Sequence, residues 1–257
     1  MLFILVPALT RSDPTSFAGS PLSAPSWSHP FGTDQLGRDV FARVFAAGMT
    51  DLTITVACVG ASLAIGTALG LLLVVSGRAV REVALRLVDA FLAIPYMLLV
   101  LLLAVGVGDR LAVPGLPSRT PALILAIVVS GWAPYTRFAV ARGLSLRERE
   151  SVVAAQLLGY GRLRILLRHV APDVASTNLS YAATQAVATL GGIASLAFLG
   201  VGIGDPHPEL GQMMQQGISL LPVAWWISLI PGLAILVLGT GFGLIADSFG
   251  QDSGGQK

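Results

Sequence analysis

Charged residues are scarce in this 257-residue sequence. Only 12% of its residues are Asp, Glu, Lys or Arg, whereas 54% are hydrophobic, and the mean hydropathy is +0.77. A soluble chain normally has about a quarter of its residues charged. The apolar residues also fall in long blocks, so we expect much of the surface to meet lipid rather than water.

Cysteine, lysine and histidine are also rare. The single cysteine, Cys58, excludes an intramolecular disulfide and a cysteine-based metal cage, and its apolar surroundings predict a small residue that faces lipid or another helix. The only lysine is Lys257, so the chain lacks the phosphate-binding lysine of a conventional P-loop ATPase. The three histidines lie outside the apolar blocks and no HExxH or GxSxG motif occurs, which argues against an intramembrane enzyme.

Five apolar stretches are long enough to cross a bilayer, which takes about 20 residues. We place them at residues 52–75, 87–107, 121–140, 181–203 and 224–245. The apolar residues 1–9 are too few to cross alone, and we interpret residues 1–10 as part of a first span that is short or truncated. The sequence therefore predicts an all-α membrane protein with five complete transmembrane helices and a partial first span, its transmembrane domain covering residues 51–247.

Arginine placement predicts the orientation. Seven arginines end or follow the third stretch and three lie between the first two, whereas five occupy the alternate segments. Because Lys and Arg near span ends stay in the cytoplasm, we expect a cytoplasmic loop at residues 139–176, a cytoplasmic tail at 248–257 and an external segment with an amphipathic helix at 11–50. The arginines have no interleaved aromatic residues, which argues against a nucleic-acid surface.

The cytoplasmic loop has its own pattern, SLRERESVVAAQLLGYGRLRILLRHVAPD at residues 145–173. Ser145 and Glu148 predict a capping box at the start of a helix, and Gly159 predicts the end of that helix. A second amphipathic helix is expected to follow and to end at Pro172. These patterns alone leave open a hairpin lying on anionic lipid and a knob that docks onto another protein.

The same stretch resembles the EAA loop of ATP-binding-cassette importer permeases, whose pattern is E-A-A, three residues, G, nine residues, I-x-L-P. Ala154, Ala155 and Gly159 match that pattern, Pro172 lies near its proline, and Val153 stands where the family has glutamate. The resemblance implies contact with a separate ATPase. The contact residues would be Glu150 (as a substitute for the missing glutamate), Val153, Ala154, Ala155, Gly159 and Pro172.

A second segment narrows the family. HPFGTDQLGRDVFARV at residues 29–44 resembles the external segment of dipeptide, oligopeptide and nickel permeases, and residues 196–211 and 225–235 resemble later parts of the same permeases. The matching positions are Gly32, Thr33, Asp34, Leu36, Gly37, Arg38 and Asp39. Asp34, Arg38 and Asp39 either bind substrate or the delivery protein, or cap and pair with one another; we favour the structural role, with Asp39 at a helix N-terminus.

The resemblance implies a type I importer permease bundle of the second permease subunit type, in a bacterial inner membrane. Such a chain is not itself an enzyme and binds no cofactor. It would pair with a second homologous permease subunit above two ATP-binding subunits, which hydrolyse ATP with Mg, and receive substrate from an extracytoplasmic solute-binding protein. Di- or oligopeptides are the expected substrates, with nickel or another small solute as the alternative.

A gradient-driven secondary transporter is the rival from another class. It would show internal repeat symmetry, which we do not find, and we expect no strong charge inside the spans, where a proton-coupled carrier needs a carboxylate. Gln185, Asn178 and Thr184 are the polar residues that we expect to face a pathway.

A metal site is the remaining possibility, at Asp205, His207 and Glu209. Two prolines interleave these residues, and a short external loop is far from the membrane midplane, so we expect no metal site there.

Overall fold

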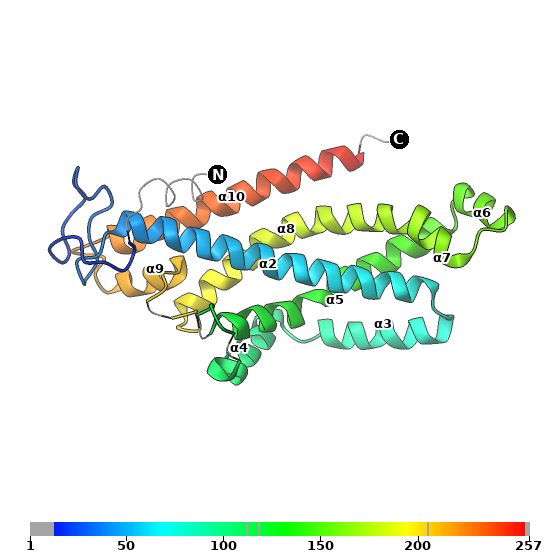
Figure 1. The fold of residues 1–257 in the computed structure, drawn as a ribbon, viewed down its shortest axis with the longest axis horizontal. Helices are drawn as coiled ribbons and strands as arrows, with labels where there is room; N and C mark the ends of the chain where they lie inside the picture. The colour runs from blue at the N-terminus through cyan, green and yellow to red at the C-terminus, as the bar shows by residue number, and fades with distance from the viewer. Residues whose placement is uncertain (1–12, 112, 118, 205, 255–257) are drawn as a thin grey trace.

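The computed structural model describes residues 13–111, 113–117, 119–204 and 206–254, with side chains as far as Ser248. These residues form a long helical bundle (Figure 1). Within the described ranges the β-structure consists of two isolated bridges, Phe17–Arg38 and Thr33–Asp39. The prediction of an all-α fold is confirmed, whereas the predicted partial first span lies outside the described residues.

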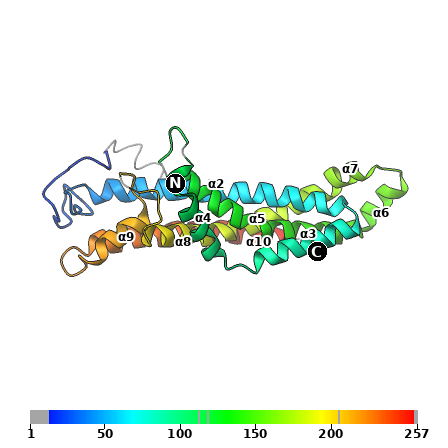
Figure 2. The same cartoon turned by 90° about the horizontal axis from the view of Figure 1, so that it is seen from below.

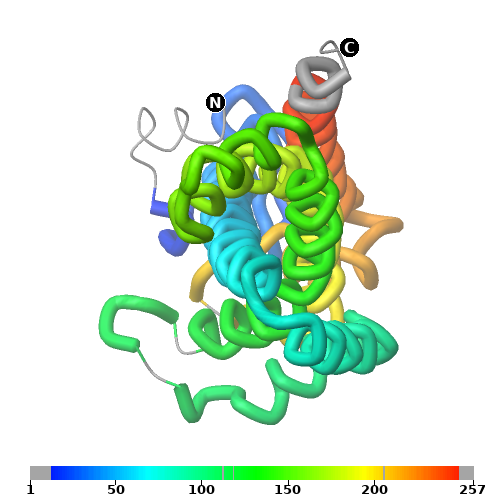
Figure 3. The backbone as a smooth tube through the Cα atoms, turned by 90° about the vertical axis from the view of Figure 1, so that its right-hand side faces the viewer, coloured from blue at the N-terminus to red at the C-terminus, as the bar shows by residue number. Residues whose placement is uncertain are grey.

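Four long helices make the body of the bundle. They are α2 (Val40–Val75), α5 (Thr120–Arg147), α8 (Ala171–Phe198) and α10 (Trp226–Gly254). The shorter elements are α3 (Arg78–Leu92), α4 (Tyr96–Val107), η1 (Gly108–Arg110), α6 (Glu150–Leu157), α7 (Arg162–Ile165), η2 (Leu166–Val170) and α9 (Leu210–Ile218). Seen along the bundle, α2, α5 and α8 gather together and α10 lies at the edge (Figure 3).

The predicted span at residues 87–107 is wrong as a single helix. The structure has α3 and α4 there, bent by 82° with respect to each other (Figure 2). Pro95 explains the break, because proline disfavours a helical residue before it and cannot donate its own backbone hydrogen bond. Among the described residues, four helices are long and apolar enough to cross a membrane, or five when this bent pair is counted as one span.

Two other spans begin earlier than predicted. Helix α2 starts at Val40, so the predicted external amphipathic helix is the first part of the same helix. Helix α8 is continuous with η2 and α7 from Arg162 onward. The prediction that a helix ends at Pro172 is therefore wrong. Pro172 lies in the first turn of α8, just after the wide π-turn of η2, where the missing backbone donor of a proline is tolerated.

The closest helix contact joins α2 to α5. A side chain on Gly66 would overlap Trp132 and Tyr135, and one on Gly70 would overlap Ala139. This GxxxG pair thus marks a real contact, where missing side chains allow the two backbones to approach closely. Gly239 and Gly243 on α10 have the same spacing but make no such contact within the described chain, because a side chain on Gly239 would be 4.0 Å from Val187 and Gly243 has no neighbour within 4 Å.

Polar side chains join the same helices. Thr136 Oγ1 on α5 donates to the Gly66 carbonyl at 3.0 Å. Asn178 on α8 is fully buried, and its Nδ2 donates to Thr67 Oγ1 at 2.7 Å and to the Tyr135 carbonyl at 3.1 Å. The expectation that Asn178 faces a pathway is therefore wrong, because its amide is used to hold α2, α5 and α8 together.

The expectation of spans without strong charge is also wrong. Asp51 lies inside α2 and is fully buried, since α2 begins before the predicted span. Asp89 on α3 and Arg137 on α5 form an ion pair between their helices, in which each charge neutralises the other.

We predict that Gly66→Val destabilises the bundle, because the added side chain forces α5 away from α2. Overpacking of this kind costs about 1–3 kcal/mol. Thermal unfolding of the detergent-purified protein measures the loss. Gly60→Val on the same helix is the control, because Gly60 has no neighbour within 4 Å; equal melting temperatures for the two variants would contradict the contact.

Candidate functional site

The cytoplasmic loop predicted from the arginines folds as a compact unit at one end of the bundle. We call residues 148–170, which contain α6, α7 and η2, the knob. The knob lies at the end of the molecule opposite α9 and residues 13–39 (Figure 1). Its position beyond the ends of α2 and α5 makes it the part of the bundle that is best placed to meet another protein.

Helix α6 has two faces of different character. Val152 and Ala155 are buried in an apolar cluster with Val74 of α2 and Leu146 of α5. On its other side α6 exposes Val153 (43%) and Leu157 (84%), and Leu158, which caps the end of the helix, is 74% exposed; we call these three residues the apolar stripe. A helix that is anchored on one side and apolar on the other suits a docking element, because an exposed apolar patch marks an interaction surface.

The boundaries of α6 differ from the prediction at one end only. Ser145 lies inside α5 and Glu148 ends that helix, so the predicted capping box is wrong; continuing α5 through this turn buries Leu146. At the other end Gly159 has φ +79°, and the Tyr160 amide donates to the Ala155 carbonyl at 3.0 Å. This is the glycine-dependent helix end that the sequence predicted.

Polar contacts brace the base of the knob. Arg142 Nε and Arg149 Nη1 both contact the carboxylate of Asp173 on α8, at 2.7 and 3.4 Å. Arg147 Nη1 donates to the Val74 carbonyl at 3.1 Å. The sequence reading used these arginines only as markers of orientation and missed Asp173. The available signal was an acidic residue in the first turn of a helix.

The structure gathers most of the predicted contact residues. Glu150, Val153, Ala154 and Gly159 are exposed on or beside α6. Ala155 is 4% exposed and faces the bundle, and Pro172 lies apart in α8. The exposed surface of the knob thus includes Glu150, Ala154, Gly159 and the apolar stripe, but not Ala155 or Pro172.

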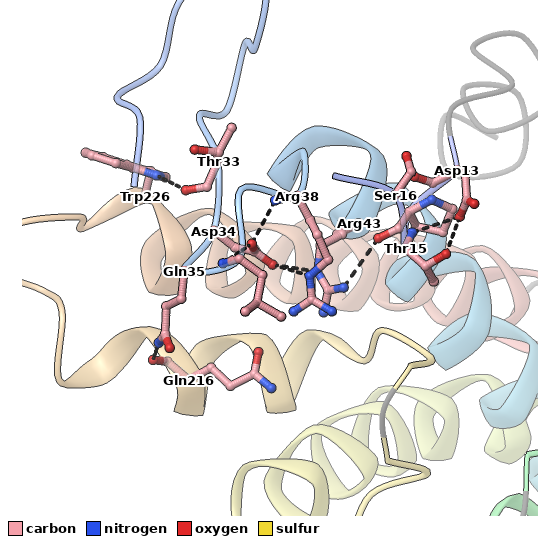
Figure 4. Close-up of polar contacts among 12 residues, drawn as sticks. Asp13, Thr15, Ser16, Thr33, Asp34, Gln35, Arg38, Arg43, Gln216 and Trp226 are labelled. Carbon is pink, nitrogen blue, oxygen red and sulfur yellow. Dashed lines mark hydrogen bonds and ion pairs between the residues drawn. The ribbon is translucent and has the colours of Figure 1, made fainter. Parts of the chain in front are cut away.

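The predicted external motif forms a buried network of hydrogen bonds and ion pairs around Asp34 (Figure 4). Asp34 Oδ1 accepts hydrogen bonds from the backbone amides of Leu36 and Arg38, at 2.8 and 2.9 Å. Asp34 Oδ2 meets Arg38 Nε at 2.6 Å and Arg43 Nε at 3.5 Å. With 5% of Asp34 exposed, these contacts compensate the buried charge.

The rest of the motif fixes the chain on α2 and α10. Asp39 caps α2 by accepting from the Ala42 amide at 3.2 Å, and Trp226 Nε1 at the start of α10 donates to the Thr33 carbonyl at 3.1 Å (Figure 4). Gly32 and Gly37 have φ +72° and +74°, which only glycine adopts freely. Of the motif side chains, Leu36 is 53% exposed. The structural role that we favoured fits these contacts.

The described residues of the possible metal cluster, His207 and Glu209, lie in different surroundings. His207 is exposed, whereas Glu209 is fully buried and its Oε2 accepts the Ile203 amide at 2.6 Å. Asp205 lies outside the described residues. Across the described part of the chain, no group of three His, Cys, Asp or Glu side chains could hold a metal ion.

The geometry is that of a bundle of membrane-crossing helices with a braced knob at one end, whose outer surface is partly apolar. Residues 60–252 match the family model described as the inner membrane component of binding-protein-dependent transport systems. The chain belongs to that family.

Named relatives agree with this assignment. A protein of Brucella suis named as a peptide permease is 34% identical over 88% of this chain and 72% of its own length. A dipeptide transport system permease protein of Alkalihalophilus pseudofirmus is 32% identical over 96% of this chain and 79% of its own length. A crystal structure of an amino acid ABC transporter has a similar fold, with a TM-score of 0.63 at 16% identity, over 82% of this chain and 94% of that one.

The chain is thus a multi-pass inner-membrane permease subunit of an ABC importer, without an ATPase site of its own. The predicted family, the ABC importer permeases, is confirmed. The alternative that the chain is a gradient-driven secondary transporter is excluded.

We predict that Asp34→Ala strongly destabilises the segment at residues 13–39, because it leaves Arg38 and Arg43 without their shared carboxylate. Breaking a buried ion pair costs about 3–5 kcal/mol. Limited proteolysis of the segment and the melting temperature report the loss. Leu36→Ala changes a nearby side chain that is 53% exposed and serves as the control; equal resistance of the two variants would show that the contacts of Asp34 are not needed.

Proposed function

We propose that this chain forms half of the translocation pathway of an importer for di- or oligopeptides and receives the ATP-driven movement through the knob. The observation that carries this proposal is the apolar stripe on α6, exposed on a helix whose other face is buried against α2 and α5. The peptide substrate is supported by the relatives, which are named for peptide and dipeptide transport.

The partners follow from that role. The chain pairs with a second homologous permease subunit, two ATP-binding subunits dock on the knobs, and an extracytoplasmic solute-binding protein delivers the substrate at the opposite end. The knob faces the cytoplasm. This orientation is supported by the ten arginines of the alternate segments 78–86 and 137–168, against five elsewhere, and by the position of the start of α3 at the knob end (Figure 1).

The knob acts as a lever because both of its connections are stiff. Val152 and Ala155 are packed against α2 and α5. Asp173, on α8, binds Arg142 and Arg149. A force on the apolar stripe therefore moves these three helices as a unit instead of deforming a loop. ATP-driven closure of the motor then favours one of two rigid arrangements of the bundle, since the contacts at the knob differ between them.

We predict that Leu157→Glu weakens the binding of the ATPase to the membrane subunits by about 10- to 30-fold, because it places a charge at the centre of an apolar contact. Co-purification of the subunits and ATP-dependent peptide uptake in reconstituted vesicles measure the effect. Leu36→Glu makes the same change at the opposite end of the bundle and should leave ATPase binding intact. Equal loss in both variants, or none in Leu157→Glu, would contradict the assignment of the docking face.

Gly159→Val tests the lever separately from the docking face. A β-branched residue at φ +79° costs about 1–3 kcal/mol, although no neighbour lies within 4 Å. We expect the end of α6 to unwind, with reduced uptake per ATP hydrolysed and normal insertion into the membrane. Gly161→Val changes a neighbouring exposed glycine at φ −65° and should retain coupling. Normal uptake by Gly159→Val would contradict the proposed role of the knob as a lever.

The substrate is tested in the same vesicles, with the solute-binding protein present. Uptake of labelled dipeptides and oligopeptides that unlabelled peptides inhibit supports the proposal. Uptake of Ni²⁺ that peptides do not inhibit would replace it with the nickel alternative.

A further inference from the structure

Two carboxylates lie completely buried at the end of the bundle opposite the knob. Asp51 is on α2 and Glu209 immediately precedes α9, and neither side chain has any exposed surface. Carboxylates are almost never buried to this extent without a basic partner or a metal ion. The external motif, the knob and the predicted pathway residues do not account for this pair.

Each carboxylate uses one oxygen to hold a backbone group. Asp51 Oδ2 accepts the amide of Leu210, the first residue of α9, at 3.2 Å. Glu209 Oε2 accepts the amide of Ile203 at 2.6 Å, in the turn that follows α8. Because Asp51 binds the residue next to Glu209, the two carboxylates lie near each other where α2, α9 and this turn converge.

The other two oxygens have no such partner. Asp51 Oδ1 and Glu209 Oε1 are buried and make no hydrogen bond with any described residue. An unsatisfied buried oxygen is costly, and two adjacent buried negative charges are more so. One proton placed between the two oxygens removes both costs, because a protonated carboxyl donates to the other carboxylate.

The surrounding elements offer few other titratable groups. Helix α9 has none, and on α2 the nearest are Arg43 and Cys58, eight and seven residues from Asp51, or about 10–12 Å along the helix. On α8 and α10 they are Asp173, Tyr181 and Asp247, far along the sequence from the pair, and His207 is exposed in the connecting loop. Burial raises the pKa of Glu209 to about 7, against the opposing effect of the nearby backbone amides of Ile203 and Gly204.

We propose that Asp51 and Glu209 form a binding site for one proton, shared between Asp51 Oδ1 and Glu209 Oε1, which fastens α9 to α2. This inference does not depend on the proposed substrate or on the ATPase contact. Loss of the proton leaves two negative charges in a closed apolar site, so it loosens the junction of α2 with α9 and with the turn after α8.

The sign of the pH effect follows from the Glu209 pKa. An unfolded glutamate loses its proton near its ordinary value of 4.5, whereas the folded chain retains it to about 7. Between these values the folded state binds more protons than the unfolded state, so stability falls as the pH rises through this window, and the contribution is gone above it.

The test uses the complete transporter in detergent, with wild-type chain, Glu209→Gln and Asp51→Asn. In Glu209→Gln the amide can donate permanently to Asp51 and so imitates the protonated pair. We expect the wild-type melting temperature to fall between pH 5.5 and 8.5, and the advantage of Glu209→Gln over wild type to grow by at least about 4 °C in that range. Asp247→Asn, which removes an exposed carboxylate on α10, should keep the wild-type pH profile.

Infrared spectroscopy of the same complexes gives a direct readout. The wild type should show a protonated carboxyl C=O band at pH 6 that shifts in ²H₂O, fades as the pH rises to 8.5, and is absent from Glu209→Gln. This measurement on the wild type stands even where a variant fails to assemble.

Three results would overturn the proposal. These are parallel pH profiles of wild type and Glu209→Gln, no protonated carboxyl band in the wild type at pH 6, and wild-type stabilisation at pH 8 by Na⁺ or Ca²⁺ that Asp51→Asn abolishes. The last result would make the pair a metal-ion site instead.

Discussion

The close approach of α2 to α5 is the constraint on which the other contacts depend. Because Gly66 and Gly70 lack side chains, the α5 backbone lies near enough for Thr136 to bond the Gly66 carbonyl. Asn178 then ties α8 to both helices. Apolar attraction does not distinguish a helix from lipid, so membrane helices need such shape and polar contacts to choose a partner. Once these three helices are fixed, the ends of α2 and α5 provide the base for the knob.

The two ends of the bundle are held by different chemistry. At the knob, apolar burial of Val152 and Ala155 is combined with exposed or half-exposed ion pairs on Asp173. At the other end, Asp34 and Trp226 hold the chain through contacts that are almost completely buried. Exposed ion pairs contribute little stability individually. Most of the rigidity of the knob therefore comes from the buried side chains of Val152 and Ala155. This arrangement suits the proposed lever, because the outer surface of the knob remains exposed for a partner.

The sequence predicted what depends on composition or on local chemistry. Long apolar runs located the membrane helices, Gly159 located a helix end, and the cap at Asp39 was expected from its type and position. The failures came from competition between local signals and packing. Ser145 and Glu148 have the spacing of a capping box, but α5 continues through Ser145 and buries Leu146. Pro95 breaks a span and Pro172 does not, because the π-turn before Pro172 accommodates it. No local pattern could show that Asp173 lies beside Arg142.

A buried acid inside α2 does not return the chain to the class of proton-driven carriers. Such a carrier needs a proton that reaches the site alternately from both sides while substrate binds beside it. Asp51 and Glu209 lie together at one end of the bundle, and both are engaged with backbone amides of α9 and the turn after α8. In our proposals a proton there acts on the fit between helices, and the energy for transport enters at the knob. The proposed proton therefore adjusts how firmly α9 is held to α2 and to the turn after α8, and it does not drive transport.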